Sequence, residues 1–236
     1  MTNLSLFTTY LDRIICPDIR FTEQHKLWIG YCLSTFVSAV LHRCARSQRP
    51  RYTAVMGPYY ERRNYSEEEY IILLKVLADM DRDYLDEAFM AAAGPFIERA
   101  KQSESFNLRV AALNCARHVF ADYTDDLYYK DLLKVMNLPE GREAFFEREG
   151  NLFLVDLKMG THWVVKVANL ELMLRYIDGQ SDAGSVMHLG THLTNLLKVS
   201  ESIFVRRAAG NSLLKIASNM TYAQRNELTV ELFNGL

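Results

Sequence analysis

Six arginines and four tyrosines gather between residues 43 and 65, and they form the strongest local binding signature in the sequence. A guanidinium group can hold a phosphate or a carboxylate through two parallel hydrogen bonds, and a tyrosine ring can stack on a base or pack at a protein interface. Tyr52 and Tyr65 are interleaved with the arginines. The candidate binding residues of this segment are Arg43, Arg46, Arg49, Arg51, Arg62, Arg63, Tyr59 and Tyr60.

The same arginines also have a structural interpretation, because acidic residues follow them closely. Glu67, Glu68 and Glu69 form one acidic run, and Asp79, Asp81, Asp83, Asp86 and Glu87 form another. Cations near the C-terminus of a helix also interact favourably with the helix dipole. Because the basic and acidic runs balance, the sequence favours a solvated helix end and loop in which the arginines pair with these carboxylates.

Two further patterns bear on metal binding and catalysis. His188 and His192 have the i, i+4 spacing of metal-binding helices, but the segment between them lacks the glutamate of the zinc-protease motif. The chain also contains no glycine loop that would cradle a phosphate and no Gly-X-Ser-X-Gly nucleophile elbow. We therefore expect no metal, no cofactor and no catalytic residue, and the sequence does not indicate an enzyme.

The triplet Gly-Thr-His occurs twice, at residues 160–162 and 190–192. The shift of 30 residues between the copies does not match the helical repeat of about 40 residues described below. Thr161 is expected to cap a helix that begins at Trp163. Gly190 and Thr191 instead lie within an apolar helical pattern, so we interpret the second copy as a coincidence.

Composition indicates that helices must position these residues. Of the 236 residues, 49% are hydrophobic and 24% are charged, while Gly (11) and Pro (5) are few. This favours helices joined by short loops in a soluble protein. The net charge of −2 does not attract DNA or anionic membranes. The longest nearly uncharged run, residues 27–41, is shorter than the roughly 20 residues that a membrane span needs.

The cysteines and the helix signals support the same class of protein. Cys16, Cys32, Cys44 and Cys115 lie in apolar helical patterns without metal-binding spacing, so we expect reduced, buried thiols and a cytoplasmic protein. Ser66 with Glu69 and Thr221 with Gln224 are capping boxes, Thr124 opens a helix, and Gly94-Pro95 marks a kink or a break. The sequence predicts an all-α chain that forms a single domain over residues 1–236.

Three segments align without gaps, namely Leu108–Val119, Val165–Tyr176 and Val205–Ile216. Each begins with an aliphatic residue followed by a base and has alanine three positions after the aliphatic residue. A small residue in the middle of a helix lets a neighbouring helix approach closely. The segments begin 57 and then 40 residues apart, so an insertion at about residues 137–161 is needed to preserve a repeat of about 40 residues.

This pattern resembles the second helix of HEAT and armadillo-type repeats, and the match is best over Val205–Ile216. The resemblance implies a HEAT-like α-α superhelix, a right-handed solenoid of antiparallel helix pairs. Residues 1–101 would then be divergent N-terminal helices and residues 102–236 the repeats. The alternative fold is an irregular helical bundle.

The resemblance also implies a function. HEAT-like scaffolds and adaptors bind a protein or peptide partner on their concave face. Arg109, Lys166 and Arg206 occupy equivalent positions, so they would form a basic ladder or fix helix packing through hydrogen bonds within each repeat. The alternative functions are a HEAT-like DNA glycosylase acting on alkylated bases and a HEAT-type bilin lyase. Nucleic acid is not favoured, because Trp163 lacks an acidic neighbour and the net charge is near zero. The oligomeric state stays open.

Overall fold

The computed structural model describes residues 3–14, 23–138, 161–178 and 183–234, and all the regular secondary structure in these ranges is helical. The prediction of an all-α chain is therefore confirmed. The chain divides into two compact units, Met1–Val135 and Met136–Leu236, where the sequence had predicted one domain. The division falls at the start of the expected insertion. Most of that insertion lies outside the described residues.

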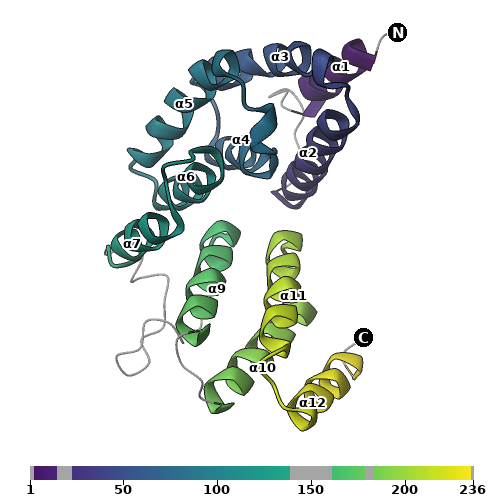
Figure 1. The fold of residues 1–236 in the computed structure, drawn as a ribbon, viewed down its shortest axis with the longest axis vertical. Helices are drawn as coiled ribbons and strands as arrows, with labels where there is room; N and C mark the ends of the chain where they lie inside the picture. Colours follow the sequence, from purple (N-terminus) through teal and green to yellow (C-terminus); the bar gives the residue numbers. More distant parts are fainter. Residues whose placement is uncertain (1–2, 15–22, 139–160, 179–182, 235–236) are drawn as a thin grey trace. The chain divides into compact units, whose positions relative to one another are not determined.

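The helices of the first unit form two rows (Figure 1). One row contains α1, α3 and α5, and the other contains α2, α4 and α6, because α1 contacts α3, α3 contacts α5, α2 contacts α4 and α4 contacts α6. The helices are α1 (Asn3–Ile14), α2 (Glu23–Arg43), α3 (Arg49–Glu61), α4 (Glu67–Asp79), α5 (Glu87–Lys101), α6 (Phe106–Val119) and α7 (Asp125–Met136), with the 3-10 turns η1 (Arg46–Gln48) and η2 (Arg82–Tyr84).

Helices α3 and α5 share the sequence Gly-Pro-aromatic-X-Glu-Arg at residues 57–62 and 94–99, which lie 37 residues apart. Their side chains make the same contact. The Arg62 guanidinium carbon lies 4.9 Å from the centre of the Tyr59 ring, and that of Arg99 lies 5.8 Å from the centre of the Phe96 ring. Sequence and contacts therefore identify α3 and α5 as equivalent elements.

Both shared prolines lie inside continuous helices. Pro95 does not break α5, which runs from Glu87 to Lys101, so the expected break at Gly94-Pro95 is absent. A proline lacks the N–H that would bond to the carbonyl four residues earlier. Because Pro58 and Pro95 and the residues that supply these carbonyls, Ala54 and Ala91, are all exposed, water can hydrate the freed carbonyl groups.

Helices α4 and α6 also correspond, with an offset of 39 residues between their N-cap serines, Ser66 and Ser105. Residues 71–80 and 110–119 are buried, half-buried or exposed in the same order at every position except Ala78 and its counterpart Arg117. The helix pair α3–α4 thus matches the pair α5–α6. This correspondence falls largely in residues 1–101, the part of the chain in which the sequence had indicated only divergent helices.

The ends of these helices are fixed by side chains. Both predicted capping boxes are present, at Ser66 with Glu69 and at Thr221 with Gln224. The Thr124 hydroxyl accepts from the N–H of Leu127 at 3.4 Å, as expected for a residue that opens a helix. Arg82 in η2 donates to the carbonyl oxygens of residues 117, 118 and 120, at distances of 2.7 to 3.4 Å. These bonds satisfy carbonyl groups that the end of α6 leaves without a helical partner.

Aromatic packing forms the core between α3 and α5. Tyr60 is 1% exposed, and its ring makes edge contacts with Phe89 and Phe96 at centroid distances of 5.4 and 5.2 Å. The Tyr60 hydroxyl donates to the carbonyl oxygen of Leu73 at 3.4 Å. Burial raises the pKa of this phenol well above its usual range.

The cysteines only partly match the expectation of buried thiols. Cys115 is fully buried in α6, and burial raises the pKa of its thiol, so it stays protonated. Cys32 is exposed and Cys44 is half-buried. Cys16 lies outside the described residues.

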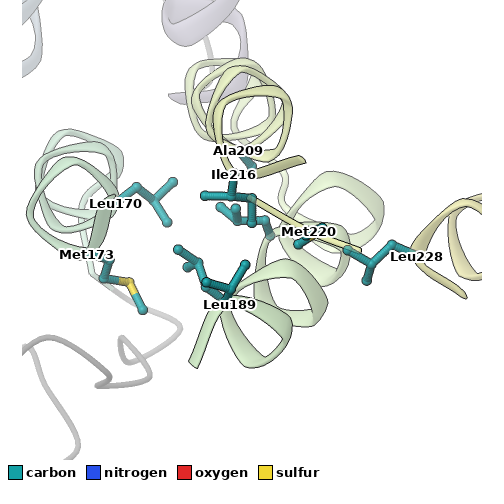
Figure 2. Packing of buried hydrophobic residues seen from close by; sticks show 9 residues of the cluster. Leu170, Met173, Leu189, Ala209, Ile216, Met220 and Leu228 are labelled. Atoms are coloured by element: carbon teal, nitrogen blue, oxygen red, sulfur yellow. The ribbon is translucent and has the colours of Figure 1, made fainter. Parts of the chain in front are cut away.

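The second unit contains α9 (Trp163–Asp178), α10 (Ala183–Val199), α11 (Ile203–Ala217) and α12 (Tyr222–Phe233). Helix α11 contacts both α9 and α10, and α12 contacts α10. Figure 2 shows the core that they share, in which Leu170 from α9, Leu189 from α10 and Ile216 from α11 point toward one another. Each unit therefore has its own hydrophobic core.

Gly190 on α10 faces the buried Leu228 of α12. A Cβ atom at this position would lie 2.6 Å from Cδ1 of Leu228 and 2.8 Å from Cε of Met220. Both neighbours are buried members of the core cluster. The absence of a side chain at residue 190 is therefore what lets α12 dock on α10.

None of the helices in the described part of the chain combines the length and the apolar character needed to cross a bilayer.

Candidate functional site

The arginine-rich segment divides into two groups at opposite ends of α3. Arg43, Arg46, Arg49 and Arg51 lie at or before the first turns of this helix, and Arg62 and Arg63 follow its last residue. Because a helix rises about 1.5 Å per residue, the 13 residues of α3 place the two groups about 20 Å apart. The structure therefore does not gather all six arginines into one surface.

Two arginines of the first group contact η2, which belongs to the acidic run. Arg46 and Asp83 form an ion pair at 3.9 Å between two exposed side chains. The Arg49 guanidinium carbon lies 4.2 Å from the centre of the Tyr84 ring, a cation-π contact. These contacts agree with the structural interpretation of the segment. Arg43, Arg51 and Arg63 are exposed.

Tyr59 and Tyr60 are core residues, which corrects their prediction as surface-binding residues. They lie on the buried side of α3 together with Tyr52, Thr53 and Met56. The spacing of these five residues places them on the face of α3 that packs against its neighbours. Neither ring can therefore stack on a ligand at the surface.

Two residues of the predicted basic ladder, Arg109 and Arg206, bind backbone carbonyl groups just before their own helices. Arg109 donates from Nη1 to the carbonyl oxygens of Ser103 and Glu104, at 3.0 and 3.2 Å. Arg206 donates from Nη1 to the carbonyl oxygen of Ser200 at 2.7 Å. Both arginines thus bind a carbonyl group six residues earlier in the chain. Lys166 is half-buried at the equivalent position, but its corresponding carbonyl group lies outside the described residues.

A sequence signal accompanies this contact. The triplet Ser-Glu-Ser occupies residues 103–105 before α6 and residues 200–202 before α11, and in each case an arginine follows the first serine by six positions. The third residue of each triplet is the N-cap of its helix. The same arrangement of loop and arginine therefore occurs twice. In each case the arginine binds the loop before its helix and so fixes the start of that helix.

Replacing Arg206 with alanine is expected to destabilise the second unit by about 2 kcal/mol, because a hydrogen bond from a charged donor to a half-buried carbonyl group is lost. Urea unfolding of the chain followed by circular dichroism measures this effect. The matched control is Arg207→Ala, which removes an exposed neighbour and should change stability by less than about 0.5 kcal/mol. Equal losses in the two variants would contradict a specific role for Arg206.

A pocket of about 300 Å³ lies between the C-terminal ends of α2 and α4 and the turn η2. Its volume is at the lower end of the range for small-molecule sites. It is lined by Ser38, Ala39, His42, Asp79, Asp81 and Tyr84. Apart from the two aspartates, which were assigned to a charge run, sequence reasoning did not select these residues. They come together only through the packing of segments about 40 residues apart.

Hydrogen bonds hold one wall of the pocket in place. The hydroxyl of Ser38 donates to the backbone carbonyl of Asp79 at 2.9 Å, and the Asp79 carboxylate accepts from Ser34 and from Lys75. The negative charge of Asp79 is thus largely compensated by Lys75.

The other wall of the pocket carries an exposed hydrogen-bond acceptor. His42 Nδ1 and the Tyr84 hydroxyl lie 3.4 Å apart. The Asp81 carboxylate accepts from the N–H of Asp83 at 3.4 Å and is otherwise exposed. This wall can therefore bind a ligand that donates hydrogen bonds or carries positive charge.

No protein-family model matches this chain, and comparison with curated proteins and with solved structures finds no match either.

The remaining sequence candidates do not form a chemical site in the described part of the chain. Trp163 is buried and stacks on Phe204, with ring centres 4.2 Å apart, so it belongs to the core. His162 Nδ1 accepts from the N–H of Val164 at 3.2 Å, so the imidazole caps α9 at the position next to Thr161. His188 is exposed and His192 half-buried on α10. Within the described ranges, no three or more His, Cys, Asp or Glu side chains are grouped to hold a metal ion.

Proposed function

We propose that this protein is a non-catalytic helical-repeat scaffold of the α-solenoid type, and that it binds a protein or peptide partner along the row α2–α4–α6. The observation that carries the proposal is the match between the helix pairs α3–α4 and α5–α6 in sequence, burial and side-chain contacts. Stacked helix pairs present an extended surface on which equivalent positions recur, and repeat proteins use such surfaces to hold partners.

Equivalent positions on α4 and α6 carry hydrogen-bonding side chains. Lys75 corresponds to Asn114, and Asp79 corresponds to His118. Asp79 and His118 are exposed, and Lys75 and Asn114 are half-buried. The row therefore presents polar groups to solvent at equivalent positions, as a partner-binding surface requires.

The pocket between the C-terminal ends of α2 and α4 supports a particular chemistry for the partner. The exposed Asp81 carboxylate offers hydrogen-bond acceptors, and neither a lysine nor an arginine lines the pocket. A lysine or arginine side chain of the partner would supply hydrogen-bond donors and positive charge. The proposal therefore specifies a partner segment that contains at least one basic residue.

Selection of peptides from a displayed random library on the purified chain tests this function. The expected result is a set of peptides that share a basic residue and lose at least about tenfold in affinity with the Asp81→Asn variant, because a charge-assisted hydrogen bond is lost. Glu87→Gln is the matched control, since this exposed carboxylate lies outside the pocket and its loss should leave affinity unchanged.

Two results would overturn the proposal. The first is selected peptides that bind the Asp81→Asn and Glu87→Gln variants equally well. The second is release of a modified base when the chain is incubated with alkylated duplex DNA, together with DNA affinity that falls steeply with salt concentration. That second result would establish the glycosylase alternative.

A further inference from the structure

Helix α12 packs against its own unit on one side only. Leu228 is its buried residue, at 3% exposure, and α10 is the helix that α12 contacts extensively. The contact is close because Gly190 on α10 lacks a side chain. One anchoring residue on a helix of 12 residues leaves most of the helix surface uncovered.

The opposite side of α12 carries large apolar side chains that are exposed to solvent. Tyr222 is 80% exposed, Phe233 is 72% exposed and Val230 is 52% exposed. Residues 222, 226, 229 and 233 follow one another at intervals of four, three and four, so they lie on one face of the helix, and Val230 lies at its edge. Leu228 follows Asn226 by two positions, about 200° around the helix axis. We call this outward side the α12 stripe.

We propose that the α12 stripe is a dimer interface, in which α12 of one copy packs antiparallel against α12 of a second copy of this chain. The spacing of Tyr222, Asn226, Thr229 and Phe233, four, three and four residues, is the same in both directions along the helix. Antiparallel pairing of two copies places each Tyr222 opposite the partner's Phe233 and each Asn226 opposite the partner's Thr229. The α12 stripe is therefore complementary to the same stripe on a second copy, as a twofold interface requires.

The chemistry of the stripe fits this pairing. Tyr222, Asn226, Thr229 and Phe233 are uncharged, so the pairing brings no like charges into contact. Two aromatic pairs form at the two ends, and a polar Asn–Thr contact forms on each side of the centre. Aromatic pairs stabilise a contact beyond the apolar area that they bury.

The exposed area also suits a dimer. Two largely exposed aromatic rings and one valine present on the order of 400 Å² of apolar surface on each copy. A stable interface buries roughly 800 Å² per partner and consists of an apolar core with a polar rim. Tyr222, Val230 and Phe233 would supply the apolar part of the contact, and Asn226, Thr229 and the flanking polar side chains of α12 would supply its polar part. This interface involves the second unit and is independent of the proposed partner binding.

Sedimentation equilibrium of the full chain, from micromolar to near-millimolar concentration, tests the proposal. The expected result is a mass that rises with concentration to about twice the 27.2 kDa of one chain. Phe233→Glu should keep the chain at the mass of a monomer, because it removes both aromatic pairs and places a charge against the Tyr222 ring of the second copy. Leu127→Glu, which alters an exposed leucine of α7 in the first unit, should leave dimerisation unchanged.

Disulfide formation between two single-cysteine variants tests the direction of pairing. In a chain with Cys16, Cys32 and Cys44 replaced by serine, an equimolar mixture of Tyr222→Cys and Phe233→Cys should form interchain disulfides faster than either variant alone. A chain that stays monomeric at all concentrations would overturn the proposal, as would a dimer that Phe233→Glu leaves intact. Faster cross-linking of each variant with itself would overturn the antiparallel register.

Discussion

Replacing Tyr60 with alanine is expected to lower the free energy of unfolding by about 3–5 kcal/mol, the range measured when a large buried aromatic side chain is removed. The ring of Tyr60 is enclosed by Phe89 and Phe96, and α3 and α5 meet there. Its removal leaves a cavity that a close-packed core cannot fully close. Urea unfolding of the variant, followed by circular dichroism, measures the loss.

The control is Tyr60→Phe, which keeps the ring and removes the hydroxyl bond of 3.4 Å to the Leu73 carbonyl. This variant should lose at most about 1 kcal/mol. The pair of variants also separates the two interpretations of Tyr60. A Tyr60→Ala chain that keeps full stability but loses peptide affinity would return Tyr60 to the binding surface predicted from the sequence.

Replacing Gly190 with leucine is expected to destabilise the second unit by about 3 kcal/mol or more, at the upper end of the usual cost of overpacking. The first added atom alone would come within 2.8 Å of both Leu228 and Met220. These two side chains are buried, so they have little room to move. The measurement is the midpoint of thermal or urea unfolding of the variant.

Gly210 provides a matched position on α11. A Cβ atom there would lie 3.5 Å from the nearest side-chain atom, Cδ2 of Leu197, which is an ordinary contact. Gly210→Ala should therefore change stability by no more than about 1 kcal/mol, and its sign should be stabilising because alanine favours a helix more than glycine does. Gly190→Ala should still destabilise the second unit, because its Cβ atom meets Leu228 and Met220. Similar destabilisation at both positions would show that Gly190 is not a special point of close approach.

The features that could be predicted from the sequence are local ones. Helix content, the two capping boxes and the helix start at Thr124 depend on residues within one or two turns of each other. The predicted role of Arg109 and Arg206 in helix packing also depends on a short loop, and the repeated Ser-Glu-Ser triplet is the signal that accompanies it.

The features that could not be predicted depend on tertiary packing. The pocket exists because His42, Asp79 and Tyr84, which are distant in sequence, meet at the ends of α2 and α4 and at η2. Tyr60 looked like a surface residue because arginines surround it in the sequence, but the rotational phase of α3 turns its ring inward. The similarity between the pairs α3–α4 and α5–α6 is hard to predict because its clearest marker, Gly-Pro with Glu-Arg, lies in α3 and α5. These helices lack the aliphatic residue and base that begin the three aligned segments.

The extensive contacts between the α-helices join elements no more than two apart along the chain. Contacts between residues that are close in sequence form quickly, because little chain entropy is lost in closing the intervening loops. The first unit is also one continuous segment, and all of its residues precede those of the second unit. During synthesis, α1 to α6 can therefore collapse into a protected core while the residues of the second unit are still being translated. Burial of hydrophobic surface can therefore begin once the first unit, Met1–Val135, has left the ribosome.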